Sequence, residues 1–368
     1  MSGAALVHDY FVQDGGAEHV AIELARLLPS ATVHTTFFDP DVFGARLDLS
    51  RVHPWRLNTP WLRARFRALL PIYPAYFSTL DLRDRDFVLS SSSAFAKAAR
   101  AGRRATHVAY IHAPMRFAWQ YATYSSGSSL SLPARVAGRV LGAPLRTWDR
   151  RTSQRPDVLV ANSSNIRDRI SRFWGRDSEV IYPPVNVEEF DVPTRDEGYL
   201  LVAARLLAYR RVDIAVDAAT ASGRELVVVG DGPERQALEG RAGGNVRFEG
   251  VVGRERVIQL MAGCSAYLVP GEEDFGMAPV EAMAAGKPVV ALGRGGTAET
   301  VIDGVTGVLF EDQTPRALLE AIARLDSLTL DADQIRAHAQ RFGTNRFRDD
   351  FRDLFRRLGV DPSLYALG

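Results

Sequence analysis

The sequence is poor in cysteine, with a single residue at position 264, and this scarcity excludes an internal disulfide framework. Because Cys264 lies in an apolar run, we expect a buried core thiol in a reducing compartment rather than a nucleophile. No apolar run reaches the 18 residues of a membrane-spanning helix. Met1-Ser2-Gly3 leads straight into a strand-like segment without the regions of a signal peptide, so we expect a cytoplasmic protein.

Net charge is also nearly absent, at +1 for 368 residues, so no global positive field favours nucleic acid as a partner. The length exceeds that of one ordinary hydrophobic core and predicts two domains. A hydrophobic content of 46% is enough to build a core in each of them.

The N-terminal half begins as an α/β unit. A short strand over 4–7 is followed by the turn Gly15-Gly16 and by a helix to residue 28 with a broad apolar face. Gly15 and Gly16 let the backbone approach a ligand closely, and a helix start attracts phosphate. Most Gly-Gly pairs, however, only form turns.

Histidine 112 follows a predicted strand over 105–111. Ligands of parallel α/β sheets bind outside the carboxyl ends of the strands, so His112 is better placed for function than the other six histidines. Its imidazole can donate or accept a hydrogen bond near neutral pH. The alternative is a histidine packed in a turn. A Ser/Gly-rich segment, 125–131, is predicted to form a loop near this site.

Residues 46–104 contain eleven Arg and one Lys against four Asp, which makes this part strongly basic. Within it, Trp61–Leu70 mixes Arg with Trp, Phe and Leu. A helix of this composition suits an anionic membrane surface, because Arg stems snorkel and aromatic rings enter the interface. An ordinary domain helix with a solvated basic face is an equal alternative.

The C-terminal half alternates predicted strands, at 199–203, 225–229, 245–248, 264–269 and 288–292, with helices. This alternation predicts a second parallel sheet. Residues 183–197, rich in Pro and acids, are predicted to link the two domains.

Several polar groups follow these strands. Arg205 and Arg210 follow the first, and guanidinium forks suit diphosphate oxygens. Glu273 follows the 264–269 strand, and a helix carrying Glu281 begins soon after it. Carboxylates accept hydrogen bonds from hydroxyls while a helix start attracts anions, so a sugar phosphate would use both. The alternative is a set of surface cations and first-turn helix acids.

In combination, the segments VHDYFVQDGGAEHV, YIHAPMRFAW, ANSSNI, VIYPPVN, ARLLAYRRVD, VVGDGPE, EEDFGMAPVEAMAAGKPVV and GGTAETVIDGVTGVLF are highly specific. Through them the chain resembles the retaining glycosyltransferases of family 4, most closely bacterial mannosyltransferase-like members that build cell-surface polysaccharides. The resemblance implies the α/β GT-B fold, in which two Rossmann-like domains with parallel sheets face each other across a cleft. It implies domains over 1–183 and 198–343, a linker over 184–197, and a terminal segment, 344–368, that packs back on the first domain.

The same resemblance implies residue roles. The catalytic residues would be His112, Arg205, Arg210 and Glu273, and the donor-binding residues Gly15, Gly16, Phe275, Gly276, Met277 and Glu281. Glu273 would bind hydroxyls of the donor sugar and Glu281 those of the nucleotide ribose. No metal and no cofactor are expected. Two positions depart from the pattern, because Arg210 replaces the usual Lys and Gln120 stands where Asp is common.

The implied activity is transfer of a hexose, best guessed as mannose from GDP-mannose, to a saccharide or lipid-linked saccharide. The alternatives are a UDP-hexose donor or a non-catalytic subunit that binds nucleotide sugars. A peripheral position on the inner face of the plasma membrane would present Trp61–Leu70 to a lipid-linked acceptor.

Overall fold

The computed structural model describes residues 3–120, 132–193 and 195–366, with the backbone alone over 132–141. These residues form two compact units. Unit 1 holds the described residues up to 120 together with 132–184 and 345–366, and unit 2 holds those from 185 to 344. Each unit is described by itself below.

Unit 1 contains a seven-stranded sheet in the order β3-β2-β1-β5-β7-β8-β9, with every neighbouring pair parallel. The central strands are fully buried, as expected for a parallel sheet with both faces covered. The strands are β1 (Ala4–His8), β2 (Thr32–Thr35), β3 (Val52–Pro54), β5 (Phe87–Ser92), β7 (Thr106–Ile111), β8 (Val158–Ala161) and β9 (Glu179–Val180). Two short strands, β4 (Asp81–Leu82) and β6 (Arg100–Ala101), pair separately.

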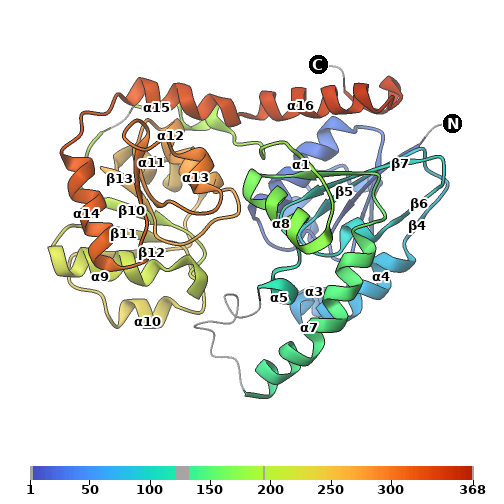
Figure 1. Cartoon of the computed structure of the whole chain (residues 1–368), viewed down its shortest axis with the longest axis horizontal. Coiled ribbons are helices and arrows are strands. Elements are labelled where there is room, and N and C mark those ends of the chain that lie inside the picture. The colour runs from blue at the N-terminus through green and yellow to red at the C-terminus, as the bar shows by residue number, and fades with distance from the viewer. Residues whose placement is uncertain (1–2, 121–131, 194, 367–368) are drawn as a thin grey trace. The chain divides into compact units, whose positions relative to one another are not determined.

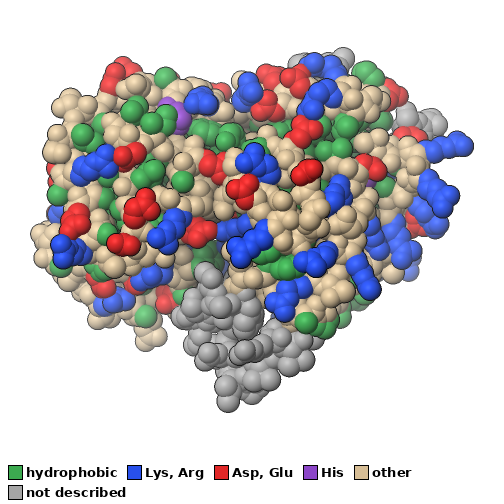
Figure 2. Space-filling model, viewed as in Figure 1, with side chains coloured by type: hydrophobic (Ala, Val, Ile, Leu, Met, Phe, Trp, Pro, Cys, Tyr) green, Lys and Arg blue, Asp and Glu red, His purple; other side chains and the backbone are tan. Residues whose placement is uncertain are grey.

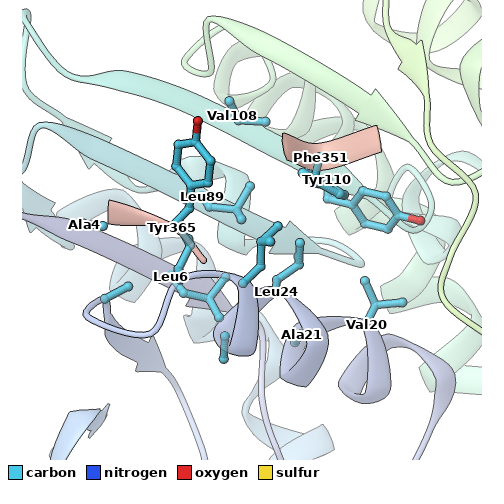
Figure 3. Close-up of a cluster of buried hydrophobic side chains, with 14 of the residues drawn as sticks. Ala4, Leu6, Val20, Ala21, Leu24, Leu89, Val108, Tyr110, Phe351 and Tyr365 are labelled. Carbon is cyan, nitrogen blue, oxygen red and sulfur yellow. The ribbon is translucent and has the colours of Figure 1, made fainter. Parts of the chain in front are cut away.

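The helices of unit 1 are α1 (Gly16–Leu27), α2 (Pro40–Phe43), α3 (Pro60–Arg63), α4 (Tyr73–Thr79), α5 (Arg116–Trp119), α7 (Leu132–Thr152), α8 (Ser164–Trp174) and α16 (Thr344–Arg357). The last of these lies beside α1, where Arg348 pairs with Glu23 at 2.6 Å (Figure 1). Its buried residues include Phe351, which packs against Tyr110 of β7 with ring centroids 5.8 Å apart (Figure 3). The C-terminal helix therefore completes the core of the N-terminal sheet, because its apolar stripe covers strands β1, β5 and β7.

The segment 61–70 is not the single amphipathic helix that its composition predicts. It divides into α3 and a 3-10 helix over Phe66–Ile72, because Arg65 leaves the helical region at φ −115° and ψ 18°. Pro71 has no N–H for the next helical hydrogen bond, which prevents a regular α-helix here. Phe66 turns into the core at 8% exposure while Trp61 stays 63% exposed.

Unit 2 contains a six-stranded parallel sheet in the order β12-β11-β10-β13-β14-β15. Its strands are β10 (Leu200–Ala203), β11 (Leu226–Val229), β12 (Val246–Gly250), β13 (Ala266–Val269), β14 (Val289–Leu292) and β15 (Gly307–Phe310). Its helices are α9 (Val212–Ser222), α10 (Arg235–Glu239), α11 (Arg254–Gly263), α12 (Met277–Ala284), α13 (Thr297–Thr300), α14 (Pro315–Asp326) and α15 (Ala332–Ala339). Helices α9 and α14 share one core cluster with the sheet, and α11, α12 and α15 lie on its other side (Figure 1).

Both sheets place their strands in the doubly wound order, in which the chain starts at the centre, moves to one edge and then returns to build the other half. This order creates a switch point at the carboxyl ends of β1 and β5 in unit 1, and of β10 and β13 in unit 2. Ligands of such sheets bind at switch points. The predicted α/β fold with two Rossmann-like parallel sheets is confirmed.

Two local predictions differ from the structure. Cys264 precedes the strand rather than starting it, because α11 ends there and β13 begins at Ala266. The thiol is still buried, and burial raises its pKa to about 12. The linker predicted over 184–197 is packed in its first half, since Val187 and Phe190 are buried. The loop predicted over 125–131 lies outside the described residues.

Within the described residues, no helix has both the length and the hydrophobicity needed to span a membrane.

Candidate functional site

The carboxyl edge of the unit 2 sheet brings two predicted residues into contact. Arg210 ends a 3-10 turn that follows β10, and Glu273 follows β13, so both stand at the switch point. The Arg210 guanidinium forms an ion pair with the Glu273 carboxylate, and the two side chains are 24% and 15% exposed. Arg205, also after β10, is exposed at the same edge. A guanidinium and a carboxylate thus meet where a ligand of this fold is expected.

Two glycines allow the loops at this edge to touch. A Cβ added to Gly271 would lie 2.6 Å from the carbonyl oxygen of Arg210. A Cβ on Gly295 would lie 2.4 Å from the carbonyl oxygen of Glu273, and Gly295 has a φ of +72° that favours glycine. The next residue, Gly296, donates its N–H to the same oxygen at 2.8 Å. Loop packing therefore determines where the Glu273 backbone lies.

Helix α12 begins at this edge. Gly276 is its N-cap at φ 93° and has no side chain to cap the first-turn N–H groups. These groups, which include the N–H of Met277, are donors of the kind that bind phosphate or hydroxyl oxygen at helix starts. The Phe275 ring is buried against Phe342, with ring centroids 5.6 Å apart, so Phe275 offers only its backbone to a ligand. Donor binding by residues 275–277 stays a prediction.

Glu281, one turn further along α12, has a partner that sequence reasoning missed. Its Oε1 accepts a hydrogen bond from Nη1 of Arg254 at 2.8 Å, and Nε of Arg254 donates to Oε2 of Glu189 at 2.8 Å. The guanidinium also lies 4.7 Å from the ring centroid of Phe190. Arg254 begins α11 just after β12, so its position after a strand was the signal that could have identified it.

In unit 1, three residues meet at the switch point of the sheet. His112 follows β7, and its Nε2 lies 2.8 Å from Oγ of Ser91 in β5. Nδ1 of His8, the last residue of β1, lies 3.1 Å from the same hydroxyl. Burial lowers the pKa of His112 to about 3, and burial together with the neighbouring His112 lowers the pKa of His8 to about 3. Both imidazoles are therefore neutral near pH 7 and act as hydrogen-bonding groups rather than cations.

Asp9, the residue after His8, holds the loop that follows β5. Its carboxylate accepts four backbone N–H bonds, at 2.6 to 3.0 Å, from residues 93–96. This contact joins the two central strands at their carboxyl ends. It was missed from sequence because the partners lie more than 80 residues apart.

The Gly15-Gly16 turn starts α1 as predicted, with Gly15 as an extended N-cap. Glu18, at the third helical position, is only 3% exposed, although sequence reasoning gave it no role. Burial raises its pKa to about 8, against the opposing effect of hydrogen bonds from its own N–H and that of Gly15. Glu18 is three residues after the N-cap, Gly15, which is where the acid of a capping box stands. This spacing was the signal in the sequence that could have identified it.

Gln120, one of the two departures from the family pattern, accepts a hydrogen bond through Oε1 from Nη1 of Arg169 at 3.2 Å. No group of three or more His, Cys, Asp or Glu side chains gathers as a metal site within the part of the chain that the structure describes.

Comparison with known proteins finds a family match for each half of the chain. Residues 14–189 match the family described as Glycosyltransferase Family 4, and residues 187–342 match Glycosyl transferases group 1. An uncharacterized glycosyltransferase of Methanocaldococcus jannaschii is 32% identical over 174 residues, which cover 46% of this chain and 49% of the relative. The D-inositol 3-phosphate glycosyltransferase of Streptomyces griseus is 28% identical over 239 residues, or 51% of each chain. The chain thus spans about half the length of these curated relatives.

Solved structures agree on the fold. Anabaena HepE, solved in complex with UDP, aligns with a TM-score of 0.70 at 19% identity over 96% of this chain and 100% of its own. The sucrose-phosphate synthase of Thermosynechococcus elongatus aligns with a TM-score of 0.69 at 18% identity, over 98% and 100%. Each half of the chain is thus similar to a glycosyltransferase family, and the two doubly wound sheets have the GT-B fold of these solved structures.

Proposed function

We propose that this protein is a retaining glycosyltransferase that moves a hexose from a nucleotide-diphosphate sugar to an acceptor hydroxyl. The observation that carries the proposal is the gathering of Arg205, Arg210, Glu273 and the start of α12 at one switch point. Cations and helix N–H groups suit a diphosphate, and carboxylates suit sugar hydroxyls. The matched glycosyltransferase domains support the same reaction class.

The chemistry follows from these roles. The bond between the anomeric carbon and the β-phosphate oxygen breaks while the acceptor oxygen bonds to the same face of that carbon. The acceptor proton passes to the departing phosphate oxygen. Arg205 and Arg210 stabilise the charge that builds on the diphosphate, which is electrostatic catalysis without a protein nucleophile. No metal ion is needed for this role when guanidinium groups supply the positive charge.

The Arg210–Glu273 ion pair adds a step to donor binding. In the structure the two side chains pair with each other, while the buried Nε of Arg210 has no hydrogen-bond partner among the described residues. A bound donor gives Arg210 a diphosphate to pair with and gives Glu273 hydroxyl donors to accept from. Donor binding therefore exchanges one internal ion pair for two contacts with the ligand.

We propose mannose from GDP-mannose as the donated sugar, and a saccharide or lipid-linked saccharide of the cell surface as the acceptor. The motifs shared with bacterial mannosyltransferase-like proteins support this choice. UDP-glucose is the alternative donor, because HepE was solved with UDP-glucose.

A thermal-shift panel of GDP-mannose, UDP-glucose, GDP and UDP tests the donor. A nucleotide at about 100 times its Kd is expected to stabilise the protein by about 2.7 kcal/mol. Glu281→Ala is expected to lose that shift, while Glu320→Ala, which removes an exposed helix acid of the same unit, keeps it. A shift without sugar transfer or donor hydrolysis would instead indicate a non-catalytic subunit, and no shift with any nucleotide would contradict the proposal.

We further propose a cytoplasmic enzyme that contacts the membrane peripherally through 61–70. Trp61 is 63% exposed, and the Arg65 guanidinium lies 4.4 Å from its ring centroid. Cosedimentation with anionic vesicles is expected to fall when Trp61 and Arg65 are changed to Ser. Unchanged cosedimentation would refute the membrane contact.

A further inference from the structure

A pocket of about 400 Å³ opens at the amino edge of the unit 1 sheet. Its lining includes His107, which lies at the amino end of β7, and Asp157, which lies just before β8. Strand β6 and Arg83, the residue after β4, also line the pocket. His112 follows the carboxyl end of β7, so the pocket and the candidate donor residues of unit 1 occupy opposite edges of one sheet. The proposed function gives this pocket no role.

The lining is strongly basic. Four arginines line the pocket, namely Arg83, Arg100, Arg103 and Arg155, whereas Asp157 is the one acid among its lining residues. Figure 2 shows Lys and Arg side chains gathering at the side where Figure 1 places β4 and β6.

The nearby acids balance only part of this charge. Oδ2 of Asp157 accepts the backbone N–H of His107 at 2.8 Å, and Asp81, outside the lining, pairs with Arg83. Arg100 and Arg103 are both exposed at the mouth. A ligand that enters the pocket therefore meets an excess of guanidinium groups.

Two further observations fit a negatively charged ligand in this pocket. Burial and the charge of Arg100 lower the pKa of the Arg155 guanidinium, which indicates like-charge crowding. The buried His107 ring bonds to Ser90 through Nε2 at 2.6 Å, but its Nδ1 has no hydrogen-bond partner among the described residues. An anion in the pocket relieves the crowding, because it places negative charge between the arginines.

The geometry points to a binding site for a phosphate or diphosphate group in this pocket. Guanidinium forks bind phosphate oxygens in pairs, and four arginines line this pocket. Gly102 lets the chain approach Arg83, since a Cβ there would lie 2.7 Å from the carbonyl oxygen of Arg83. The ligand is a phosphorylated molecule other than the sugar donor, because the pocket lies at the edge of the sheet away from His112. Its phosphate comes either from a free metabolite or from a lipid headgroup.

Calorimetric titration with inorganic pyrophosphate tests the site. The titration uses the full chain carrying Arg205→Ala and Arg210→Ala, so that diphosphate binding at the proposed donor site does not contribute. Adding Arg100→Ser and Arg103→Ser is expected to weaken pyrophosphate binding by about tenfold or more, because their charge-assisted hydrogen bonds to the phosphate oxygens are lost. Arg104→Ser is the matched control, because Arg104 is exposed and adjacent but does not line the pocket.

Vesicles distinguish the two sources of phosphate. Vesicles of phosphatidylcholine with and without phosphatidylglycerol are mixed with the wild type, with Arg100→Ser/Arg103→Ser, and with Arg63→Ser/Arg65→Ser. If binding to anionic vesicles is lost in Arg100→Ser/Arg103→Ser but kept in Arg63→Ser/Arg65→Ser, the site binds a lipid headgroup. If pyrophosphate binding depends on Arg100 and Arg103 but vesicle binding does not, the site binds a free phosphorylated ligand.

If neither ligand shows a dependence on Arg100 and Arg103 while circular dichroism confirms a folded variant, the site is refuted. This outcome is independent of the proposed transferase activity, which the nucleotide panel tests at the other unit. Both arginines are exposed, so their replacement is expected to leave the fold intact.

Discussion

Arg254 and Glu281 form an ion pair in which Nη1 lies 2.8 Å from Oε1, and the Glu281 side chain is only 13% exposed. Arg254 therefore orients the carboxylate that is predicted to hold the ribose of the donor. Because Arg254 also pairs with Glu189, its guanidinium is held at two points. We therefore predict that Arg254 is a positioning residue for donor binding.

Replacing Arg254 with Ala is expected to raise the KM for the donor about three- to tenfold with little change in kcat. A half-exposed ion pair contributes about 1 kcal/mol, and the interaction is the same in the ground state and the transition state. Steady-state kinetics of donor hydrolysis or transfer measures both constants. Arg256→Ala is the control, since Arg256 lies on the same helix as Arg254 and pairs with Glu249 of β12. An unchanged KM would remove Arg254 from donor binding.

Arg205 is expected to act on the leaving group. Arg205→Ala should lower kcat by roughly 10²-fold or more, because one electrostatic contact to a developing charge is worth this much in comparable sites. The kcat of Arg210→Lys should lie between that of the wild type and that of Arg210→Ala, because Lys keeps the positive charge but loses the planar fork of donors. Arg224→Ala, which breaks a surface pair with Asp326, is the matched control. Near-normal turnover in a folded Arg205→Ala variant would rule out this role.

Gly295 is expected to tolerate no side chain. In Gly295→Ala the new Cβ meets the Glu273 carbonyl oxygen at 2.4 Å, and the φ of +72° is itself strained for Ala. We expect a loss of about 1–3 kcal/mol in the free energy of unfolding, together with weaker donor binding. Urea denaturation measures the first effect. Gly244→Ala, whose Cβ would meet nothing within 4 Å, should be nearly neutral, and equal stability of the two variants would contradict the argument.

Three buried histidines of unit 1 are expected to make the fold acid-sensitive. Burial is the main cause that lowers the native pKa of His8, His107 and His112 to about 3, against about 6.5 in the unfolded chain. The native pKa lies below the unfolded one, so this stability is fully present above pH 6.5 and is lost as pH falls towards 3. The three histidines should therefore lower the free energy of unfolding of unit 1 between pH 7 and pH 5, while Glu18, whose native pKa is raised to about 8, makes an opposing contribution over the same range.

Urea denaturation at pH 5 and pH 7 checks the histidine prediction. His107→Gln should reduce the difference between the two pH values, because one proton fewer is taken up on unfolding. Replacing His53, an exposed histidine, serves as the control. The same difference between the two pH values in His107→Gln and in the wild type would overturn the prediction.

Lys97 and Asp149 form a fully buried ion pair at 2.6 Å in unit 1. The indole N–H groups of Trp119 and Trp174 both donate to the second carboxylate oxygen of Asp149 at 2.7 Å. Lys97→Met leaves the carboxylate charge buried without its cation and should cost about 3–5 kcal/mol of unfolding free energy. Arg316→Met, which breaks an exposed helix pair, should cost less than about 0.5 kcal/mol. Chemical denaturation measures the free energy of unfolding of both variants. Equal losses would contradict a larger role for the buried ion pair.

Much of the fold follows from local signals in the sequence. The apolar strand segments and the glycine turns predicted two parallel sheets, and the structure confirms them. Predictions failed where a local pattern was overridden. Residues 61–70 have the composition of one helix, but Pro71 and the burial of Phe66 divide it.

The candidate site was only partly accessible to sequence reasoning. Arg210 and Glu273 were predicted separately, each from its place after a strand, and their roles stay predictions. Their direct pairing is a property of the folded chain, because β10 and β13 are neighbours in space but not in sequence. Ser91, which bridges His8 and His112, carried no motif that would have marked it.

The sequence by itself determined the fold class and the residue types at the strand ends, because hydrophobic periodicity and glycine placement act over a few residues. Only the tertiary structure decided which of those residues meet. The Arg254–Glu281 pair and the His8–Ser91–His112 cluster join residues 21 to 83 positions apart, and the basic pocket joins segments from 83 to 157. Such contacts depend on the order of strands in the sheets, which arises from packing the whole chain rather than from any one segment.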